Sequence, residues 1–148
     1  MLRIGLGEDS HRTNVPHDHS LVGHSDADVL LHAVTDALLG AAGLTDIGRL
    51  FPNTDPANRG RDSADFLRLA YAQVQAAGFE LVNLDCVVAA ERPRLAPHND
   101  VIRQRIAEIL GVSPTQIGLK AKTGEGVGPV GRGESIEARC VALVTKGQ

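Results

Sequence analysis

Aromatic residues are scarce in this chain of 148 residues: they make up 3% of it, and tryptophan is absent. Proteins that bind single-stranded nucleic acids stack bases on aromatic side chains, and this composition provides no such platform. The formal net charge of −3 gives no basic field for nucleic acid or for an anionic membrane surface. We therefore expect neither a nucleic acid nor a membrane as a partner.

Cysteines and long apolar runs are also lacking. Cys86 and Cys140 each lie in an apolar, strand-like run, which is typical of small buried residues in a reducing compartment and not of a disulfide framework. No apolar run approaches the roughly 20 residues of a membrane span, and the glycine-rich start of the chain does not fit a secretory signal. A cytoplasmic location is expected. The length and the 43% hydrophobic content predict one domain over residues 1–148.

Apolar periodicity and turn residues predict an α+β fold. Helices are expected at residues 25–43, 63–77 and 97–110. Strands are expected at residues 2–7, 81–90, 117–123 and 136–145, with loops over 45–60 and the glycine-rich stretch 124–133. The order of these elements predicts a mixed four-stranded sheet with the helices packed on one face.

Asp9, His11 and His32 offer one carboxylate and two imidazoles, the donor set of a catalytic transition-metal site that leaves a fourth position for substrate. Residues two apart in a strand point to the same side, so Asp9 and His11 can converge on one ion. His32, on a predicted helix, would complete the set. Asp28 and Asp36 lie one turn on either side of His32, where they either orient its ring or serve as capping and surface charges.

Two further segments suit a phosphorylated substrate. Lys122, Thr123 and Glu125 end a predicted strand, where they can neutralise phosphate charge, hydrogen-bond phosphate oxygens and hold a hard cation such as Mg²⁺. Arg132 lies between glycines, which let the backbone approach a phosphate while the guanidinium binds it bidentately. A solvated strand end is the alternative for the first segment, and ordinary turn chemistry is the alternative for the polar loop at 45–55.

These pieces occur together in motifs that resemble one family over nearly the whole chain. The motifs are Gly-x-Gly-x-Asp-x-His at residues 5–11, His-Ser-Asp-Ala-Asp-Val-x-x-His-Ala-x-Thr-Asp-Ala-Leu-Leu-Gly-Ala at 24–41, Asp-Ile-Gly-x-Leu-Phe-Pro-x-Thr-Asp-Pro at 46–56, Glu-Arg-Pro-Arg-Leu-x-Pro-His at 91–98, and Lys-Ala-x-Thr-x-Glu followed by Gly-Arg-Gly-Glu within 120–134. In these motifs the chain is similar to the 2-C-methyl-D-erythritol 2,4-cyclodiphosphate synthases of the non-mevalonate isoprenoid pathway.

The resemblance implies a cyclising phosphorus–oxygen lyase. The family converts 4-diphosphocytidyl-2-C-methyl-D-erythritol 2-phosphate into the cyclic diphosphate: the 2-phosphate oxygen attacks the β-phosphorus in line, and CMP leaves. It also implies a homotrimer whose active sites lie between neighbouring subunits. Apolar residues of the strand at 136–144 are then expected to line the centre of the trimer.

The resemblance also implies roles for individual residues. The implied Zn²⁺ ligands are Asp9, His11 and His32, and Glu125 is implied to hold a second cation, Mg²⁺ or Mn²⁺. His24 and Thr123 match positions that stabilise the transition state. The methylerythritol side of the pocket corresponds to Ser25, Asp46, Ile47, Gly48, Phe51, Pro52, Asn53, Thr54 and Asp55. The cytidine and diphosphate side corresponds to Ala90, Glu91, Arg92, Pro93, Arg94, Leu95, Ala96, Lys122 and Gly124, while Pro129 and Arg132 line the end of the central cavity.

Three features depart from the family pattern. Only the twelve residues 12–23 separate His11 from His24, where the family has a longer hairpin. Asn53 stands where aspartate is usual, which removes one charge, and Pro129 stands where many members have phenylalanine.

Two other classes of function remain open at this point. A metal-dependent phosphoesterase using the same three ligands would release inorganic phosphate instead of CMP. A non-catalytic trimeric binding protein would release neither product, although the presence of Lys122, Thr123, Glu125 and Arg132 argues against it. A synthase needs no strong general base, because its phosphate nucleophile is already an anion.

Overall fold

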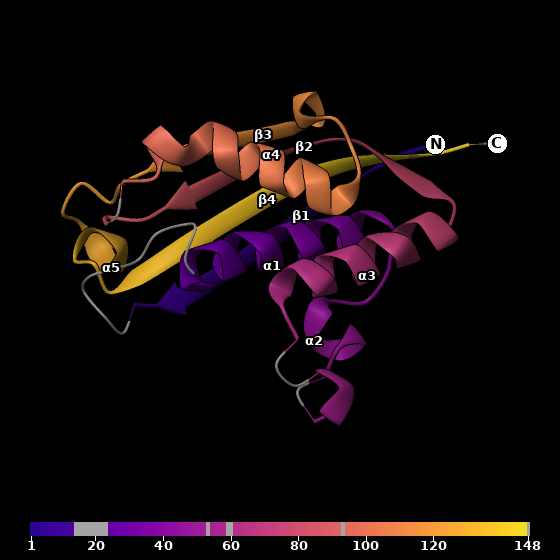
Figure 1. The fold of residues 1–148 in the computed structure, drawn as a ribbon, viewed down its shortest axis with the longest axis horizontal. Coiled ribbons are helices and arrows are strands. Elements are labelled where there is room, and N and C mark those ends of the chain that lie inside the picture. The colour runs from indigo at the N-terminus through magenta and orange to yellow at the C-terminus, as the bar shows by residue number, and fades with distance from the viewer. Residues whose placement is uncertain (14–23, 53, 59–60, 93, 148) are drawn as a thin grey trace.

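The fold is built on one mixed sheet with the strand order β1–β4–β2–β3 (Figure 1). The computed structural model describes residues 1–13, 24–52, 54–58, 61–92 and 94–147, and the side chains of residues 24–27 lie outside this description. The strands are β1 (Leu2–Arg12), β2 (Phe79–Ala89), β3 (Ile117–Lys122) and β4 (Ser135–Lys146). β4 is antiparallel to β1 and β2, whereas β2 and β3 are parallel. The α+β fold and its mixed four-stranded sheet are therefore as predicted.

Three long helices cover one face of this sheet: α1 (His24–Ala41), α3 (Ser63–Ala76) and α4 (Asn99–Leu110) (Figure 1). Short turns of helix connect them: α2 (Ile47–Leu50), η1 (Pro56–Asn58), η2 (Ala96–His98), η3 (Pro114–Gln116) and α5 (Gly128–Gly131). Among the described residues, none of the helices combines the length and apolar character needed to span a bilayer.

The helix ends follow local chemistry. The Asp62 side chain accepts a hydrogen bond from the backbone N–H of Ala64 and so begins α3. Gly111 ends α4 in the left-handed conformation, with φ of 68°, which costs glycine little. The end of α4 at this glycine is as predicted.

One strand end and two predicted loops differ from the sequence-based expectation. β1 continues to Arg12, because it pairs with β4 along its whole length, from Leu2 opposite Thr145 to Arg12 opposite Ser135. The loop predicted at 45–60 contains α2, whose first turn is capped by Asp46. The glycine-rich stretch predicted as a loop contains α5, which has Pro129 in its first turn, where proline is tolerated.

Side chains alternate across the sheet, and this alternation separates a core from an open face. The apolar even-numbered residues of β4 are buried under the helices: Ile136, Ala138, Cys140, Ala142 and Val144. The expectation that the apolar side chains of this strand line a trimer centre is wrong for these five. Exposed apolar side chains on the opposite face come mainly from β1, with Leu2 65%, Ile4 72% and Leu6 61% exposed, joined by Val141. Both cysteines are buried and free, as predicted.

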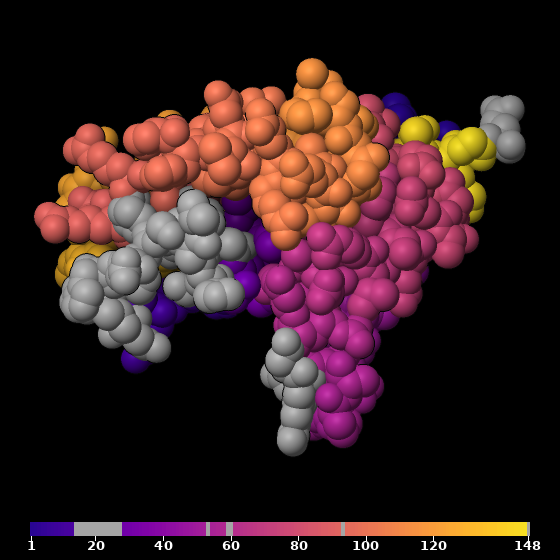
Figure 2. Space-filling view, viewed as in Figure 1, coloured from indigo at the N-terminus to yellow at the C-terminus, as the bar shows by residue number. Residues whose placement is uncertain are grey.

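Residues after α1 form a lobe that projects from the helical layer. It carries α2 and η1 and is visible below the body of the protein in Figure 2. Phe51 anchors this lobe: its ring lies 5.0 Å from that of Phe66 on α3, centroid to centroid. Aromatic packing at this separation fixes how the lobe leaves the core.

Candidate metal centre

Asp9, His11 and His32 converge at the end of β1 that lies against α1. The Oδ2 atom of Asp9 is 3.1 Å from Nε2 of His11 and 3.1 Å from Nδ1 of His32. The three ligand atoms lie within 4.8 Å of one another, and the side chains are 25–35% exposed. The predicted triad is therefore assembled, open enough for a small ligand to reach it.

Glycines in β1 make this convergence possible. Odd-numbered residues of β1 face α1, so Gly5 and Gly7 precede Asp9 and His11 on the same side. A Cβ atom on Gly7 would lie 1.9 Å from the carbonyl oxygen of Ala33, and one on Gly5 would lie 2.0 Å from that of Ala37. Because both glycines lack a side chain, strand and helix approach backbone to backbone. This approach brings Asp9 and His11 to His32.

The electrostatics of the triad reflect the closeness of its donors. The hydrogen bond with the Asp9 carboxylate raises the pKa of His32 above its ordinary value of 6.5, while burial of the ring opposes the rise. A carboxylate and two imidazoles facing one point form an arrangement that attracts either a proton or a cation.

The aspartates one turn from His32 have different partners. Asp28 accepts a 2.6 Å hydrogen bond from the hydroxyl of Ser63, and the same hydroxyl lies 3.2 Å from Nε2 of His32. Asp36 instead accepts the backbone N–H of Ile47 at 2.9 Å, linking α1 to the lobe. Burial raises the pKa of Asp36, and the bond from Ile47 opposes this. Sequence analysis did not single out Ser63, since nothing in the local pattern distinguishes it from an ordinary helix-start serine.

The residues predicted for the methylerythritol side lie mostly on the lobe. Asp46 caps α2 by accepting the N–H of Arg49, and α2 includes Ile47 and Gly48. Phe51, Pro52, Thr54 and Asp55 follow in the turns after α2, where the N–H of Asp55 bonds the carbonyl of Pro52. Asn53 and the side chains of His24 and Ser25 lie outside the described residues. His24 is the first residue of α1.

The loop after β3 is held in a strained but well-anchored conformation. The Glu91 carboxylate accepts the backbone N–H of Gly124 at 2.9 Å, and Glu125 has a positive φ of 51°, rare for a residue with a side chain. A Cβ on Gly124 would lie 2.3 Å from the backbone nitrogen of Gly131, so this loop packs directly on α5. Thr123 and Glu125 therefore project from a fixed backbone, and both are exposed.

The other residues predicted for the cytidine side surround this loop. Ala90 and Leu95 are buried. The backbone N–H of Ala90 donates to the carbonyl of Lys122, so it is not free to bind a ligand. Arg92, Arg94, Ala96 and Lys122 are exposed, whereas Pro93 lies outside the described residues. Pro129 lies in α5, and Arg132 at its end pairs with Glu134 at 2.8 Å.

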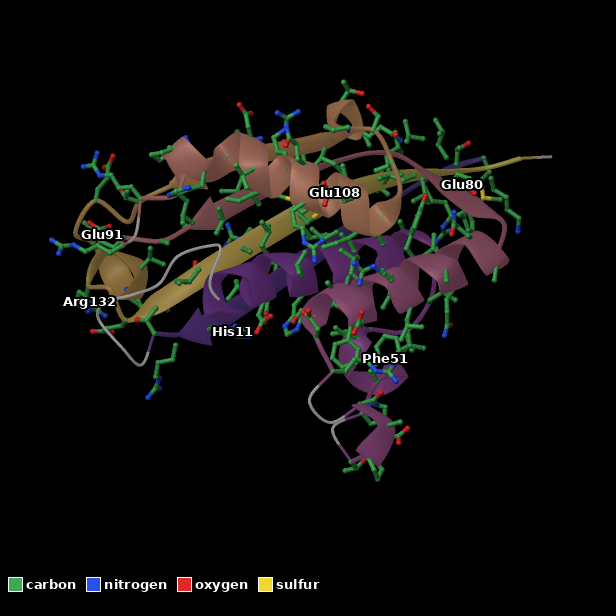
Figure 3. The ribbon with its side chains drawn as sticks, in the orientation of Figure 1. His11, Phe51, Glu80, Glu91, Glu108 and Arg132 are labelled. Carbon is green, nitrogen blue, oxygen red and sulfur yellow. The ribbon has the colours of Figure 1, made fainter. Side chains whose placement is uncertain are left out.

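Within one chain the two predicted sides are separated. Figure 3 shows Glu91 and Arg132 together near α5, Phe51 on the lobe, and His11 between these regions. Among the residues that the structure describes, the only cluster of possible metal ligands is Asp9, His11 and His32, and Glu125 does not belong to it.

The donor set fits a divalent transition metal. Two imidazole nitrogens and one carboxylate oxygen are ligands that Zn²⁺ accepts in catalytic sites with an open fourth position. In such sites a ligating histidine usually makes a hydrogen bond through its other ring nitrogen, the one that does not face the ion. His32 meets this condition, because Nδ1 faces Asp9 and Nε2 faces Ser63.

Comparisons with known proteins all indicate the same family. A family model described as the YgbB family matches residues 2–145. The 2-C-methyl-D-erythritol 2,4-cyclodiphosphate synthase of Rhodopirellula baltica is 52% identical over 155 aligned positions, which cover 97% of this chain and 93% of that protein. A structure described as Plasmodium falciparum IspF in complex with CDP is 30% identical, with a TM-score of 0.82 over 99% of this chain and 97% of that one. The bifunctional IspDF of Campylobacter jejuni is 35% identical with a TM-score of 0.90, and this chain spans 43% of its length.

Proposed function

The chain belongs to the YgbB family, and from this membership we propose that it is a 2-C-methyl-D-erythritol 2,4-cyclodiphosphate synthase. It converts 4-diphosphocytidyl-2-C-methyl-D-erythritol 2-phosphate into the cyclic diphosphate and CMP, in isoprenoid precursor biosynthesis. The oxygen of the 2-phosphate forms a bond to the β-phosphorus, and the bond from that phosphorus to the bridging oxygen breaks. The bridging oxygen leaves with CMP. The observation that carries the proposal is the convergence of Asp9, His11 and His32 at the end of β1.

Asp9, His11 and His32 hold a Zn²⁺ ion in this proposal. A bound divalent ion supplies Lewis-acid polarisation of a phosphate oxygen and neutralises charge that would repel the nucleophile. The residues of the chain do the rest. Gly5 and Gly7 keep strand and helix close enough for the three donors to meet. A phosphate nucleophile is an anion, so the site needs positioning and charge neutralisation more than a base.

The loop after β3 serves the diphosphate. Lys122 neutralises phosphate charge, and the hydroxyl of Thr123 donates a hydrogen bond to the reacting phosphates. The carboxylate of Glu125 holds a hard cation, Mg²⁺ or Mn²⁺. The hydrogen bond from Gly124 to Glu91 and the close packing on Gly131 support these roles, because they keep the loop from rearranging when the substrate arrives.

The protein works as a homotrimer in this proposal, with each site shared between neighbours and one domain over residues 1–148. Two observations support a shared site. The methylerythritol-side and cytidine-side residues lie on separate parts of one chain (Figure 3). The open face of the sheet exposes Leu2, Ile4, Leu6 and Val141, apolar side chains that packing against another subunit would cover.

Product analysis by phosphorus NMR tests the proposed reaction. The protein, loaded with Zn²⁺ and Mg²⁺, is incubated with the cytidylyl substrate, and we expect resonances of CMP and of a cyclic diphosphate in equal amounts. Inorganic phosphate in place of CMP would identify a phosphoesterase. Unchanged substrate would favour a binding protein.

Zinc analysis tests the proposed ligands separately from turnover. His11→Ala and His32→Ala each leave two ligands, so both should lose most of their zinc after dialysis. The fold should persist in both, since neither side chain belongs to the buried apolar core. His98→Ala, which removes an exposed histidine on η2, is the matched control and should keep full zinc content. Full zinc occupancy in the His11 and His32 variants would reject these ligands.

A further inference from the structure

Ser63 connects the metal centre to a second helix. It is the first residue of α3, is 6% exposed, and its hydroxyl oxygen lies between two side chains of α1. On one side it donates to Oδ1 of Asp28 at 2.6 Å, and on the other it lies 3.2 Å from Nε2 of His32. Because Asp28 and His32 are four residues apart on one helix, both face the same hydroxyl.

The direction of these hydrogen bonds follows from the donors available. An ionised carboxylate only accepts, so the single proton of the Ser63 hydroxyl is directed to Asp28. Towards His32 the hydroxyl oxygen can then act only as an acceptor, which places an N–H at Nε2. At Nδ1 the ring donates to the Asp9 carboxylate, whose Oδ2 lies 3.1 Å away. A cation bound at Nδ1 would replace that proton, while the N–H at Nε2 stays on Ser63.

We propose that Asp28 and Ser63 form a relay that fixes the tautomer and the orientation of the His32 ring for metal binding. Ser63 and Asp28 are positioning residues in this arrangement, since both act on the metal centre through the His32 ring. The relay also ties the geometry of the metal centre to the packing of α3 on α1. This inference rests on the proposed Zn²⁺ site.

Zinc affinity, measured by competition with a chromophoric chelator, tests the relay without any need for turnover. Ser63→Ala removes the acceptor at Nε2, and partners of this kind contribute about 10–100-fold to metal affinity. We expect a loss in that range, with the far-UV circular dichroism unchanged. Ser63→Thr keeps the hydroxyl and should restore most of the affinity. Asp65→Asn, at an exposed position in the same turn of α3, is the matched control and should bind zinc like the wild type.

A double-mutant cycle tests whether Asp28 acts through Ser63. Asp28→Ala alone should weaken zinc binding, because the hydroxyl proton becomes free to point at Nε2. Asp28→Ala combined with Ser63→Ala should bind no more weakly than Ser63→Ala alone. Additive losses in the double variant would overturn the relay.

The imidazole resonances of the zinc-loaded protein give a readout that a merely structural serine would not change. In the wild type we expect a slowly exchanging N–H resonance at Nε2 of His32, and Ser63→Ala should abolish it. Wild-type zinc affinity in Ser63→Ala, with that resonance retained, would overturn the inference. If His11→Ala also bound zinc like the wild type, the proposed metal site itself would fail, which is a distinct outcome.

Discussion

Replacing Gly7 by alanine should separate the two halves of the metal centre. The new Cβ would lie 1.9 Å from the carbonyl oxygen of Ala33, whereas an ordinary contact begins near 3.4 Å. The backbone of β1 would therefore have to move about 1.5 Å away from α1, the difference between these two distances. A functional metal site tolerates errors of only about 0.2 Å in its ligand distances. Asp9 and His11 would then move with β1, while His32 stays on α1.

The expected losses can be measured separately. Overpacking of this kind costs about 3 kcal/mol, at the upper end of the usual range, because the clash is with backbone atoms. For a domain of this size that lowers the melting temperature of the metal-free protein by roughly 6–12 °C. Zinc affinity, measured on the folded variant at low temperature, should fall by at least about 100-fold.

Gly40→Ala is the matched control for this prediction. Gly40 lies in α1 facing the same strand, but its Cβ would be 3.9 Å from the nearest atom, the Cα of Gly5. Alanine there should leave zinc binding unchanged and stabilise the helix by about 0.5–1 kcal/mol. Wild-type zinc affinity and melting temperature in Gly7→Ala would refute the reasoning that close backbone packing assembles the site.

Three further predictions concern the loop and the lobe. Thr123→Val should keep zinc and substrate binding but lower kcat by roughly 10²–10³, and an unchanged kcat would reduce Thr123 to a structural role. Glu91→Ala should lower kcat/KM by about tenfold through release of the Gly124 N–H, whereas Glu91→Gln should retain most activity; equal losses would contradict an anchoring role. Burial raises the pKa of Asp36, so its contribution to folding is fully present below the unfolded pKa of 3.8 and is lost as pH rises through the folded value. Asp36→Asn does not ionise, and its amide oxygen can still accept the N–H of Ile47. In urea unfolding of the metal-free protein, the variant should therefore gain stability relative to the wild type as the pH rises from 4 to 7. A difference in unfolding free energy that stays constant over this range would show that the pKa of Asp36 is not raised.

The sequence by itself determined the elements and the kind of chemistry. Helix starts, helix ends and strand alternation depend on neighbours within a few residues, so the end of α4 at Gly111 and the burial of Cys86 and Cys140 follow from local pattern. The donor types at Asp9 and His32 were likewise readable, since a carboxylate and imidazoles suit few ions besides transition metals.

Only the tertiary structure decided what those elements do together. Ser63 meets His32 across 31 positions of chain, and Glu91 meets Gly124 across 33, so no local pattern could mark either contact. What covers the apolar face of β4 from Ile136 to Val144 was also decided by the tertiary structure, because alternation marks a face for burial without saying whether the chain's own helices or another subunit covers it. The distance between β1 and α1 is set by backbone contact at Gly5 and Gly7. The sequence shows that these positions are glycines, but only the packed structure shows that a side chain there would clash with α1.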